Sequence, residues 1–326
     1  MEVLQFANGG WQRSKGLKPE AARDLAFGPT HVWIRLEGLA QDKLDSLGAV
    51  FNLHPLAIED VRSHRQRPKV EDYQELTFVV ARAPRWDHAN DQMSWLTIGL
   101  FLGPDFLITA CTDPVAELDA VEKRLLALRG GPKNSTIDRV LYEVLDAIVD
   151  AYFPIMDQLE DRIETLEDEI LSGAEFTELQ KVQSLKHIVS QTRKTIFPMR
   201  EAMAALEKGE HPNISAETCL YLRDVADHMT RLAERLEHVK EVAVLAQETY
   251  NATLANQTNR IVKFLTGVTI ILTIPMLIGT LMGMNVPVPQ WDPLRLGTFG
   301  PFWTFTAGSL LAMLPLYLWA RKKNWM

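Results

Sequence analysis

The sequence predicts an α/β domain followed by long helices and by a hairpin of two membrane-spanning helices. Three observations support this fold class. Short apolar runs of strand length alternate with helical patterns over roughly the first 130 residues. Apolar residues then recur at helical spacing as far as Lys263. Only five charged residues follow Lys263, although charged residues make up 23% of the chain.

The first part combines strands and helices. Gly103-Pro104-Asp105 predicts a turn between the last two strands. We expect strands at His31–Leu36, Glu75–Ala83, Trp95–Leu102 and Phe106–Cys111, and helices at Leu44–Asn52 and Pro114–Leu128. The pattern does not give the order of the strands.

Two long helices are expected next, at Ser135–Leu171 and Phe176–Lys208, joined by Ser172-Gly173-Ala174. One face of the first helix is apolar and the other is acidic. The acidic residues are Glu143, Asp146, Asp150, Asp157, Glu160, Asp161, Glu164, Glu167, Asp168 and Glu169. Such a face is either a solvated helix surface or a place where hard cations gather on oxygen ligands.

A single helix from about Ser215 to Gly283 follows. No Pro or Gly interrupts the segment between Asn213 and Lys263, and Ser215 is a suitable N-cap residue. At 1.5 Å per residue the helix would be roughly 100 Å long. Pro275 predicts a kink or locally weakened hydrogen bonding.

Two uncharged segments predict membrane spans, at Phe264–Gly283 and Phe302–Ala320. Each is long enough to cross about 30 Å of hydrocarbon. The alternative, a buried helical hairpin in a soluble core, is disfavoured because core helices seldom run this far without a charge. Trp303 and Trp319 near the ends of the second segment fit an interfacial aromatic belt.

The flanking charges predict the orientation. Arg260 and Lys263 precede the first span, and the basic tail Arg321-Lys322-Lys323 follows the second. The connection between the spans holds one Arg and one Asp. By the positive-inside rule, both termini and the large N-terminal body face the cytoplasm, in a cell (inner) membrane.

Composition excludes several other classes. The net charge of −8 argues against a nucleic-acid partner. Cys111 and Cys219 stand far apart, which excludes a disulfide framework or a structural zinc site. The N-terminus carries no signal-peptide pattern. We find no Walker loop, GxGxxG, HExxH or GxSxG motif, so an enzyme is not expected.

Polar residues inside the first span lie on one stripe of the helix. Thr266, Thr269, Thr273 and Thr280 follow a spacing of about 3.5 residues, with Met276 at the missing step and Asn259 upstream. Polar groups at membrane depth tend to face a bundle interior or water. The stripe therefore lines a pore, or its hydroxyls bond the i−4 carbonyls and pack helix against helix.

The first span ends in Gly283-Met284-Asn285, after an upstream run from Asn259 to Thr266. Together with the two-span C-terminus, the basic tail and the segments Leu53–Val61 and Arg67–Val70, this tripeptide resembles the CorA family of divalent-cation transporters. The signature of that family is a GMN tripeptide that ends the first of two C-terminal spans. The resemblance covers the chain from about residue 30 to its end.

The resemblance implies a homopentamer in a lipid bilayer, with long stalk helices around a central pore and cytoplasmic domains that form a magnesium-sensing funnel. It implies that Gly283, Met284 and Asn285 form the selectivity filter, where the ring of asparagine amides holds a hydrated cation. This suits Mg²⁺, which loses water reluctantly. The pore-lining residues that the resemblance implies are Asn259, Thr273, Met276 and Thr280. They overlap the stripe, whose spacing adds Thr266 and Thr269.

The family also has a regulatory metal site between subunits. Asp224 matches one of its aspartates, and Asp87 is the candidate for the other. Bound Mg²⁺ would neutralise acidic groups of adjacent subunits and keep the funnel closed.

Two departures from the family pattern concern the pore. The loop after the tripeptide is neutral as far as Trp291, with Asp292 as its only acid, so the outer mouth attracts cations less. The stripe has threonines where several relatives have apolar residues, and Leu265 or Met276 would then form the hydrophobic constriction.

Uptake of Mg²⁺, with Co²⁺ or Ni²⁺ as further substrates, is therefore the expected function, driven by the membrane potential and gated by cytoplasmic Mg²⁺. A ZntB-like Zn²⁺ transporter, proton-coupled or not, is the alternative, although no Cys or His lies in or near either span. The second alternative is a membrane-anchored metal sensor or scaffold that conducts nothing.

The expected domain boundaries follow from these assignments. They are 1–134 for the α/β cytoplasmic domain, 135–212 for the acidic helical hairpin, 213–283 for the stalk helix with its span at about 264–283, 284–301 for the outer loop, 302–320 for the second span and 321–326 for the basic tail.

Overall fold

The computed structural model describes residues 1–7, 9–38, 41–63, 66–87, 92–127, 136–173, 175–208, 211–283 and 300–323. The chain forms two compact units. The first comprises Met1–Asp168 and Thr177–Ala246, and the second comprises Glu169–Phe176 and Gln247–Met326.

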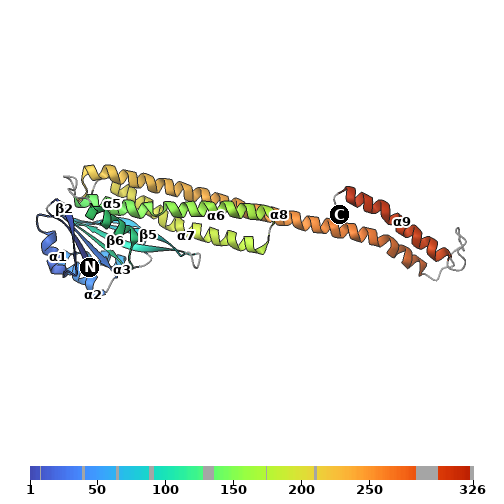
Figure 1. The fold of residues 1–326 in the computed structure, drawn as a ribbon, viewed down its shortest axis with the longest axis horizontal. Helices are drawn as coiled ribbons and strands as arrows, with labels where there is room; N and C mark the ends of the chain where they lie inside the picture. Colours follow the sequence, from blue (N-terminus) through green and yellow to red (C-terminus); the bar gives the residue numbers. More distant parts are fainter. Residues whose placement is uncertain are drawn as a thin grey trace. The chain divides into compact units, whose positions relative to one another are not determined.

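A seven-stranded sheet in the order β2-β1-β3-β7-β6-β5-β4 lies in the first unit (Figure 1). Its strands are β1 (Glu2–Ala7), β2 (Gly10–Lys15), β3 (Val32–Glu37), β4 (Lys69–Tyr73), β5 (Leu76–Asp87), β6 (Gln92–Leu102) and β7 (Phe106–Cys111). Neighbouring strands are antiparallel except β3 and β7, which are parallel with Val32 opposite Phe106. The four predicted strands are confirmed as β3, β5, β6 and β7, and the prediction lacked the other three.

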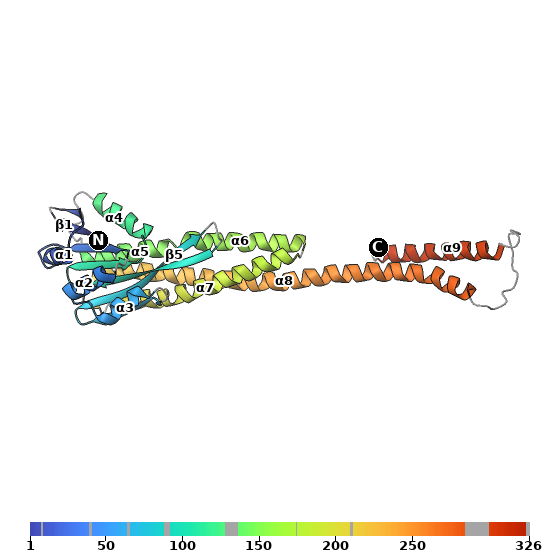
Figure 2. The same ribbon diagram turned by 90° about the horizontal axis from the view of Figure 1, so that it is seen from below.

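Helices cover both faces of the sheet (Figure 2). On one face lie α1 (Pro19–Ala26), α2 (Gln41–Phe51) and α3 (Pro55–Arg62), and on the other lie α4 (Ala116–Ala127) and α5 (Ile137–Asp150). This arrangement explains why all six residues of β7 are buried. A Cβ atom at Gly99 of β6 would overlap the Val61 side chain of α3, so the close approach of these two elements requires glycine.

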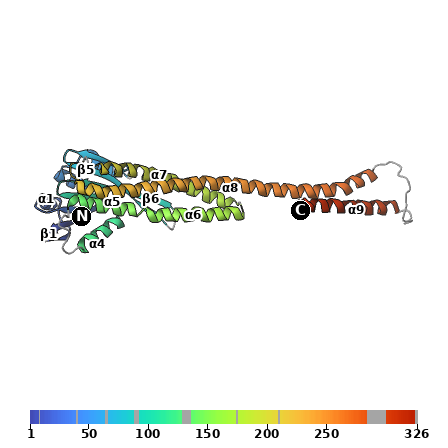
Figure 3. The same cartoon turned by 90° about the horizontal axis from the view of Figure 1, so that it is seen from above.

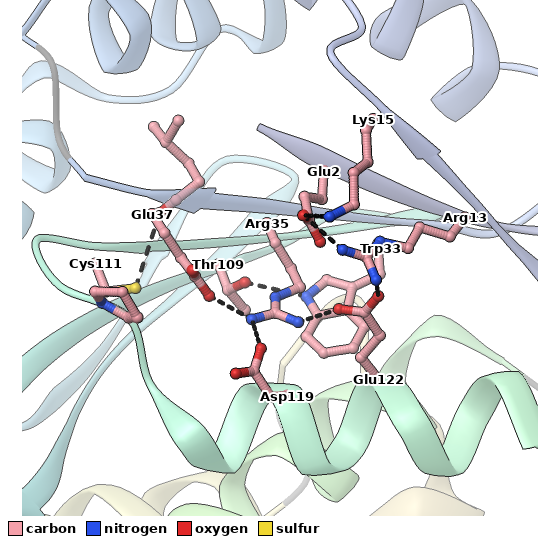
Figure 4. A network of polar contacts seen from close by, with 12 residues as sticks. Glu2, Arg13, Lys15, Trp33, Arg35, Glu37, Thr109, Cys111, Asp119 and Glu122 are labelled. Atoms are coloured by element: carbon pink, nitrogen blue, oxygen red, sulfur yellow. Dashed lines mark hydrogen bonds and ion pairs between the residues drawn. The ribbon is translucent and has the colours of Figure 1, made fainter.

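A network of polar contacts lies between α4 and the sheet (Figure 4). The buried guanidinium of Arg35 pairs with Glu122, Glu37 and Asp119, the last at 2.6 Å. Arg13 reaches the other oxygen of Glu122 at 3.0 Å. A buried arginine is tolerated here because several carboxylates surround it.

The expected single helix over Ser135–Leu171 is wrong in one respect. It is divided into α5, which ends at Asp150, and α6 (Phe153–Ser172). Pro154 explains the division, because its nitrogen cannot donate to the carbonyl of Asp150 and its ring favours the first turn of a new helix. Tyr152 at the break is fully buried and donates a hydrogen bond to the Arg82 carbonyl at 2.6 Å.

Three long helices follow along the chain, α6, α7 (Phe176–Glu207) and α8 (Ala216–Met282) (Figures 1 and 3). Ser215 caps α8, since its hydroxyl accepts a hydrogen bond from the Thr218 N–H at 3.2 Å. The Asp138 carboxylate on α5 accepts from the Ser215 N–H at 2.9 Å and from its hydroxyl at 2.6 Å. The predicted cap is thus confirmed, and it is tied to the α/β domain.

The second unit contains the last part of α8 and α9 (Gly300–Lys322), which lie side by side in all three views. Pro275 lies inside α8 and Pro315 inside α9. Residues 284–299, which connect the two helices, are outside the described part of the chain.

Candidate cation pathway and metal centre

Helix α8 is long and apolar enough to cross a membrane, the one such helix among the described residues. Only 6% of its most apolar window is buried within the chain. A core helix of a soluble protein would be mostly buried, and an exposed apolar surface of this size indicates contact with lipid or with other subunits. Helix α9 carries the second predicted span over 23 residues, about 35 Å at 1.5 Å per residue.

The predicted stripe lies on an exposed side of α8. Asn259 and the four threonines are exposed within the chain, and Met276 is 74% exposed. On the other side of the helix Gly267 is buried, and Ile271, Ile274 and Ile278 are half-buried. The chain therefore leaves the polar stripe uncovered.

Three hydroxyls of the stripe donate to their own helix. Thr269 donates to the Leu265 carbonyl at 2.8 Å, and Thr273 donates to the Thr269 carbonyl at 2.7 Å. Thr280 donates to the Met276 carbonyl at 2.8 Å. The i−4 bonding proposed for the packing alternative is therefore present. Each hydroxyl proton is donated to a backbone carbonyl, so the hydroxyl oxygen is left to act as a hydrogen-bond acceptor through its lone pairs.

The predicted selectivity filter lies at the end of α8. The Gly283 N–H donates to the Gly279 carbonyl at 3.1 Å, which continues the helical bonding. A Cβ atom at Gly283 would make ordinary contacts, the nearest at 3.5 Å, so nothing within the described chain requires glycine there. Met284 and Asn285 lie outside the described residues, and their role remains a prediction.

The two predicted regulatory aspartates lie on different elements of the first unit. Asp87 is the last residue of β5, paired in register with Gln92 of β6. Asp224 lies near the start of α8, with its side chain 59% exposed. Their assembly into one site between subunits remains a prediction.

Asp224 adjoins a cluster of metal-ligating groups that the sequence did not identify as a site. Asp146 and Asp150 of α5 and His228 of α8 bring one ligand atom each to within 4.8 Å of one another. His228 Nε2 also lies 3.7 Å from an oxygen of Asp224. Two carboxylates and an imidazole at this separation are a suitable ligand set for a divalent cation.

The electrostatics of this cluster favour a cation. Burial raises the pKa of Asp146, the negative charge of Asp150 raises it further, and the neighbouring His228 lowers it in part. His228 Nδ1 is buried without a hydrogen-bond partner and lies 3.8 Å from Asp150. A bound cation would neutralise the repulsion between the two aspartates and could use the imidazole as a ligand.

The spacing contained a signal for this cluster. Asp146 and Asp150 are four residues apart, as are Asp224 and His228, so each pair lies on one face of its helix. The sequence does not show that α5 and α8 place these two faces together.

The acidic face of α5 and α6 is used partly within the chain. Arg235 of α8 binds Asp157 at 2.6 Å and Glu160 at 2.6 Å. Arg124 lies 3.3 Å from Glu143. These acids hold helices together, which is a third role besides solvation and cation binding.

Comparison with protein families gives a match over most of the chain. Residues 29–322 match the model of the family described as CorA-like Mg²⁺ transporter protein. The chain is 28% identical over 333 aligned positions to the cobalt/magnesium transport protein CorA of Thermotoga maritima, with 100% of this chain and 92% of the relative covered. It is 24% identical over 240 positions to the zinc transport protein ZntB of Klebsiella pneumoniae, with 72% and 70% covered.

Among solved structures, the fold matches the complete structure of the CorA magnesium transporter from Methanocaldococcus jannaschii. The TM-score is 0.83 at 20% identity, with 100% of this chain and 99% of that chain covered. At this identity the match shows the fold.

Proposed function

The chain belongs to the family of CorA-like Mg²⁺ transporters, a family of divalent-cation transporters rather than enzymes, and from this premise we propose that it conducts Mg²⁺ into the cytoplasm. Co²⁺ and Ni²⁺ are further substrates. The conducting form is a homopentamer in the cell (inner) membrane, with α8 lining the pore and α9 forming the second span. Both termini face the cytoplasm, where the α/β domain lies.

The observation that carries this proposal is the exposed threonine stripe on α8. Water molecules bound to Mg²⁺ are hydrogen-bond donors, so they need acceptors along the pore. Thr269, Thr273 and Thr280 offer oxygen lone pairs because their protons are bound to backbone carbonyls. Such a stripe suits an ion that keeps its hydration shell.

Selection is assigned to the ends of the pore and gating to the cytoplasmic side. Gly283, Met284 and Asn285 form the outer filter, and Asn259 the inner end of the stripe. Asp87 and Asp224 bind regulatory Mg²⁺ between subunits, and Asp146, Asp150 and His228 bind a cation within one subunit. Asp224 and the threonine stripe are on the same helix, α8. A rotation of α8 caused by metal binding at Asp224 would therefore also turn the stripe.

The membrane potential supplies the driving force. A divalent ion moving through 100 mV gains about 4.6 kcal/mol. The basic groups at Arg260, Lys263 and 321–323 support an orientation in which the negative interior is on the side of the α/β domain.

Zn²⁺ transport is the second candidate function. The similarity to ZntB and the His228 imidazole beside two aspartates favour it, because imidazole suits Zn²⁺ better than Mg²⁺.

Uptake into liposomes tests both candidates. We expect wild-type protein to admit Mg²⁺, Co²⁺ and Ni²⁺ more readily than Zn²⁺, and Asn285→Ala to lose selectivity or flux. A pH gradient without a membrane potential should not drive Mg²⁺ uptake. Uptake of Zn²⁺ alone, driven by that gradient, would establish the second candidate, and absence of all flux would leave a sensor or scaffold.

The regulatory assignment needs its own test. Asp224→Ala should weaken the inhibition of uptake by Mg²⁺ on the cytoplasmic side. Arg223→Ala is the matched control, since Arg223 is the adjacent residue and pairs at 2.9 Å with Glu207 of α7. Equal inhibition in wild type and Asp224→Ala would remove Asp224 from the regulatory site.

A further inference from the structure

The end of the α6–α7 hairpin exposes two large apolar side chains. Leu171, next to the last residue of α6, is 68% exposed, and Phe176, the first residue of α7, is 69% exposed. Single exposed apolar residues are ordinary, but a Leu and a Phe together at a hairpin end call for a partner. Both residues belong to the second unit, which also contains the membrane part of α8.

A contact with α8 shows at which level along that helix the hairpin end lies. A Cβ atom at Gly173, between the two apolar residues, would lie 3.9 Å from Nε2 of Gln257 on α8. Gln257 precedes the predicted span, which begins at Phe264, by seven residues, or about 10 Å along a helix. The polar headgroups add roughly 5–8 Å on each side of the hydrocarbon. The hairpin end therefore lies at the level where the headgroup layer begins.

The helix directions bring Phe176 closer still. Arg235 of α8 pairs with Glu160 of α6, and Gln257 lies by Gly173, so α6 and α8 run in the same direction. Helix α7 runs back from the hairpin end, and helical side chains lean towards the N-terminus of their helix. The ring of Phe176 thus leans beyond the hairpin end, towards the side of the span.

We propose that the end of the α6–α7 hairpin docks in the headgroup layer of the membrane that α8 crosses, with Phe176 as its main anchor and Leu171 as the second. Phe and Leu side chains are favoured in this layer because insertion among the headgroups removes their apolar surface from water. The inference rests on the membrane placement given under the proposed function. It adds a direct contact between the cytoplasmic helices and lipid.

The charges at the hairpin end specify the lipid. Glu169 lies two residues before Leu171 and Glu175 lies directly before Phe176, and each makes a polar interaction within the chain. Their negative charge is repelled by anionic headgroups. Zwitterionic phosphatidylcholine or phosphatidylethanolamine is therefore the expected partner, and added phosphatidylglycerol should draw the hairpin out of the layer.

Nitroxide labels on the full-length protein test this contact. Cysteines are introduced singly as Leu171→Cys and Phe176→Cys in a Cys219→Ser background, since Cys111 is buried. Glu164→Cys and Gln183→Cys are matched controls at exposed positions further from the hairpin end. Leu311→Cys, at a position on α9 that is 71% exposed, reports on the second span. The protein is placed in phosphatidylcholine vesicles, and power saturation measures access of oxygen and of a water-soluble nickel chelate.

We expect labels at 171 and 176 to be more accessible to oxygen than to the chelate, and labels at 164 and 183 to show the reverse. Phosphatidylglycerol should shift the labels at 171 and 176 towards the chelate. Ready access of the chelate at 171 and 176 in phosphatidylcholine overturns the proposal. Poor access of both reagents there also overturns it, since a second copy of the chain then covers the patch. Leu311→Cys distinguishes failure of the docking proposal from failure of the proposed function. If the label at 311 is also accessible to the chelate, the membrane placement of the second span itself is wrong.

Discussion

Replacing Thr273 with valine keeps the shape of the side chain and removes one hydroxyl from the exposed stripe. In the structure this hydroxyl donates to the Thr269 carbonyl at 2.7 Å, so in the proposed pore its oxygen serves as a hydrogen-bond acceptor. An ordinary hydrogen bond contributes about 0.5–1.5 kcal/mol net, and more when its partner is charged. In a homopentamer the substitution removes the acceptor from all five subunits at one level of the pore. We expect Mg²⁺ flux to fall about tenfold or more, since each 1.4 kcal/mol in a barrier is tenfold.

Thr273→Ser is the matched variant, because it keeps the hydroxyl and its i−4 bond and loses only the methyl group. Its flux should remain within about threefold of wild type. Flux is measured in liposomes with a magnesium-sensitive dye, and the oligomeric state of each variant is checked by size-exclusion chromatography. If the stripe served helix packing alone, Thr273→Val would conduct like wild type while Thr273→Ser lowered oligomer stability. That pattern would refute the pore assignment.

Three further predictions concern the first unit. Burial alone would raise the pKa of Asp138, but hydrogen bonds from Ser215 and Thr136 outweigh it and lower the pKa. Ionised Asp138 therefore stabilises the folded protein fully above the pKa of an unfolded Asp, about 3.9. This stabilisation is lost as pH falls through the lower pKa of the folded protein. Asp138→Asn should lower the free energy of unfolding by about 1–2 kcal/mol at pH 7. Thermal unfolding against pH should show that this difference from wild type narrows only below about pH 4. Arg35→Ala should destabilise the domain by about 3 kcal/mol in chemical denaturation, because the buried Glu122 carboxylate loses its buried partner and, among the described residues, keeps only Arg13, at 3.0 Å. Lys15→Ala, which removes a mostly exposed partner of Glu2, should cost under about 1 kcal/mol in the same assay. We expect Co²⁺ to raise the melting temperature of the wild-type protein and to raise that of the double variant Asp146→Asn/His228→Ala less, because the other proposed cation sites remain in the variant. An equal rise in the double variant would exclude this cluster as a metal site.

The membrane part of the chain is readable from sequence because its signal is local. An uncharged segment that follows a long helix without Pro or Gly predicts α8 from about Ser215 to Gly283, and the structure has it at Ala216–Met282. The spacing of the threonines likewise determines their face, because helical geometry converts sequence separation directly into angle.

Short strands of the α/β domain are not predicted from the sequence, because they depend on pairing with distant strands rather than on a local pattern. β2 has one buried residue, Trp11, and β4 (Lys69–Tyr73) has none, so neither shows the apolar alternation of a half-buried strand. They are strands because neighbouring strands pair with them. Pro154 marks the division between α5 and α6 in the sequence, but the apolar pattern continues across it and so favours a single helix.

The candidate metal-ligating cluster shows a different limit of prediction from sequence. Each helix contributes a recognisable pair of residues, but Asp146 and Asp150 come together with His228 only through the packing of α5 against α8. That packing depends on the whole domain, including the hydrogen bonds from Ser215 to Asp138. A single sequence does not report such a long-range juxtaposition.

The dependence of Mg²⁺ uptake on membrane potential tests the central claim most directly. Wild-type protein in liposomes should accumulate Mg²⁺ against its gradient when a potassium diffusion potential of about 100 mV, negative on the side of the α/β domain, is imposed. The available energy of about 4.6 kcal/mol corresponds to a limiting ratio of roughly three orders of magnitude. Reversal of the potential should reverse the flux. Uptake that ignores the potential, or that follows an imposed pH gradient instead, would contradict a potential-driven Mg²⁺ channel.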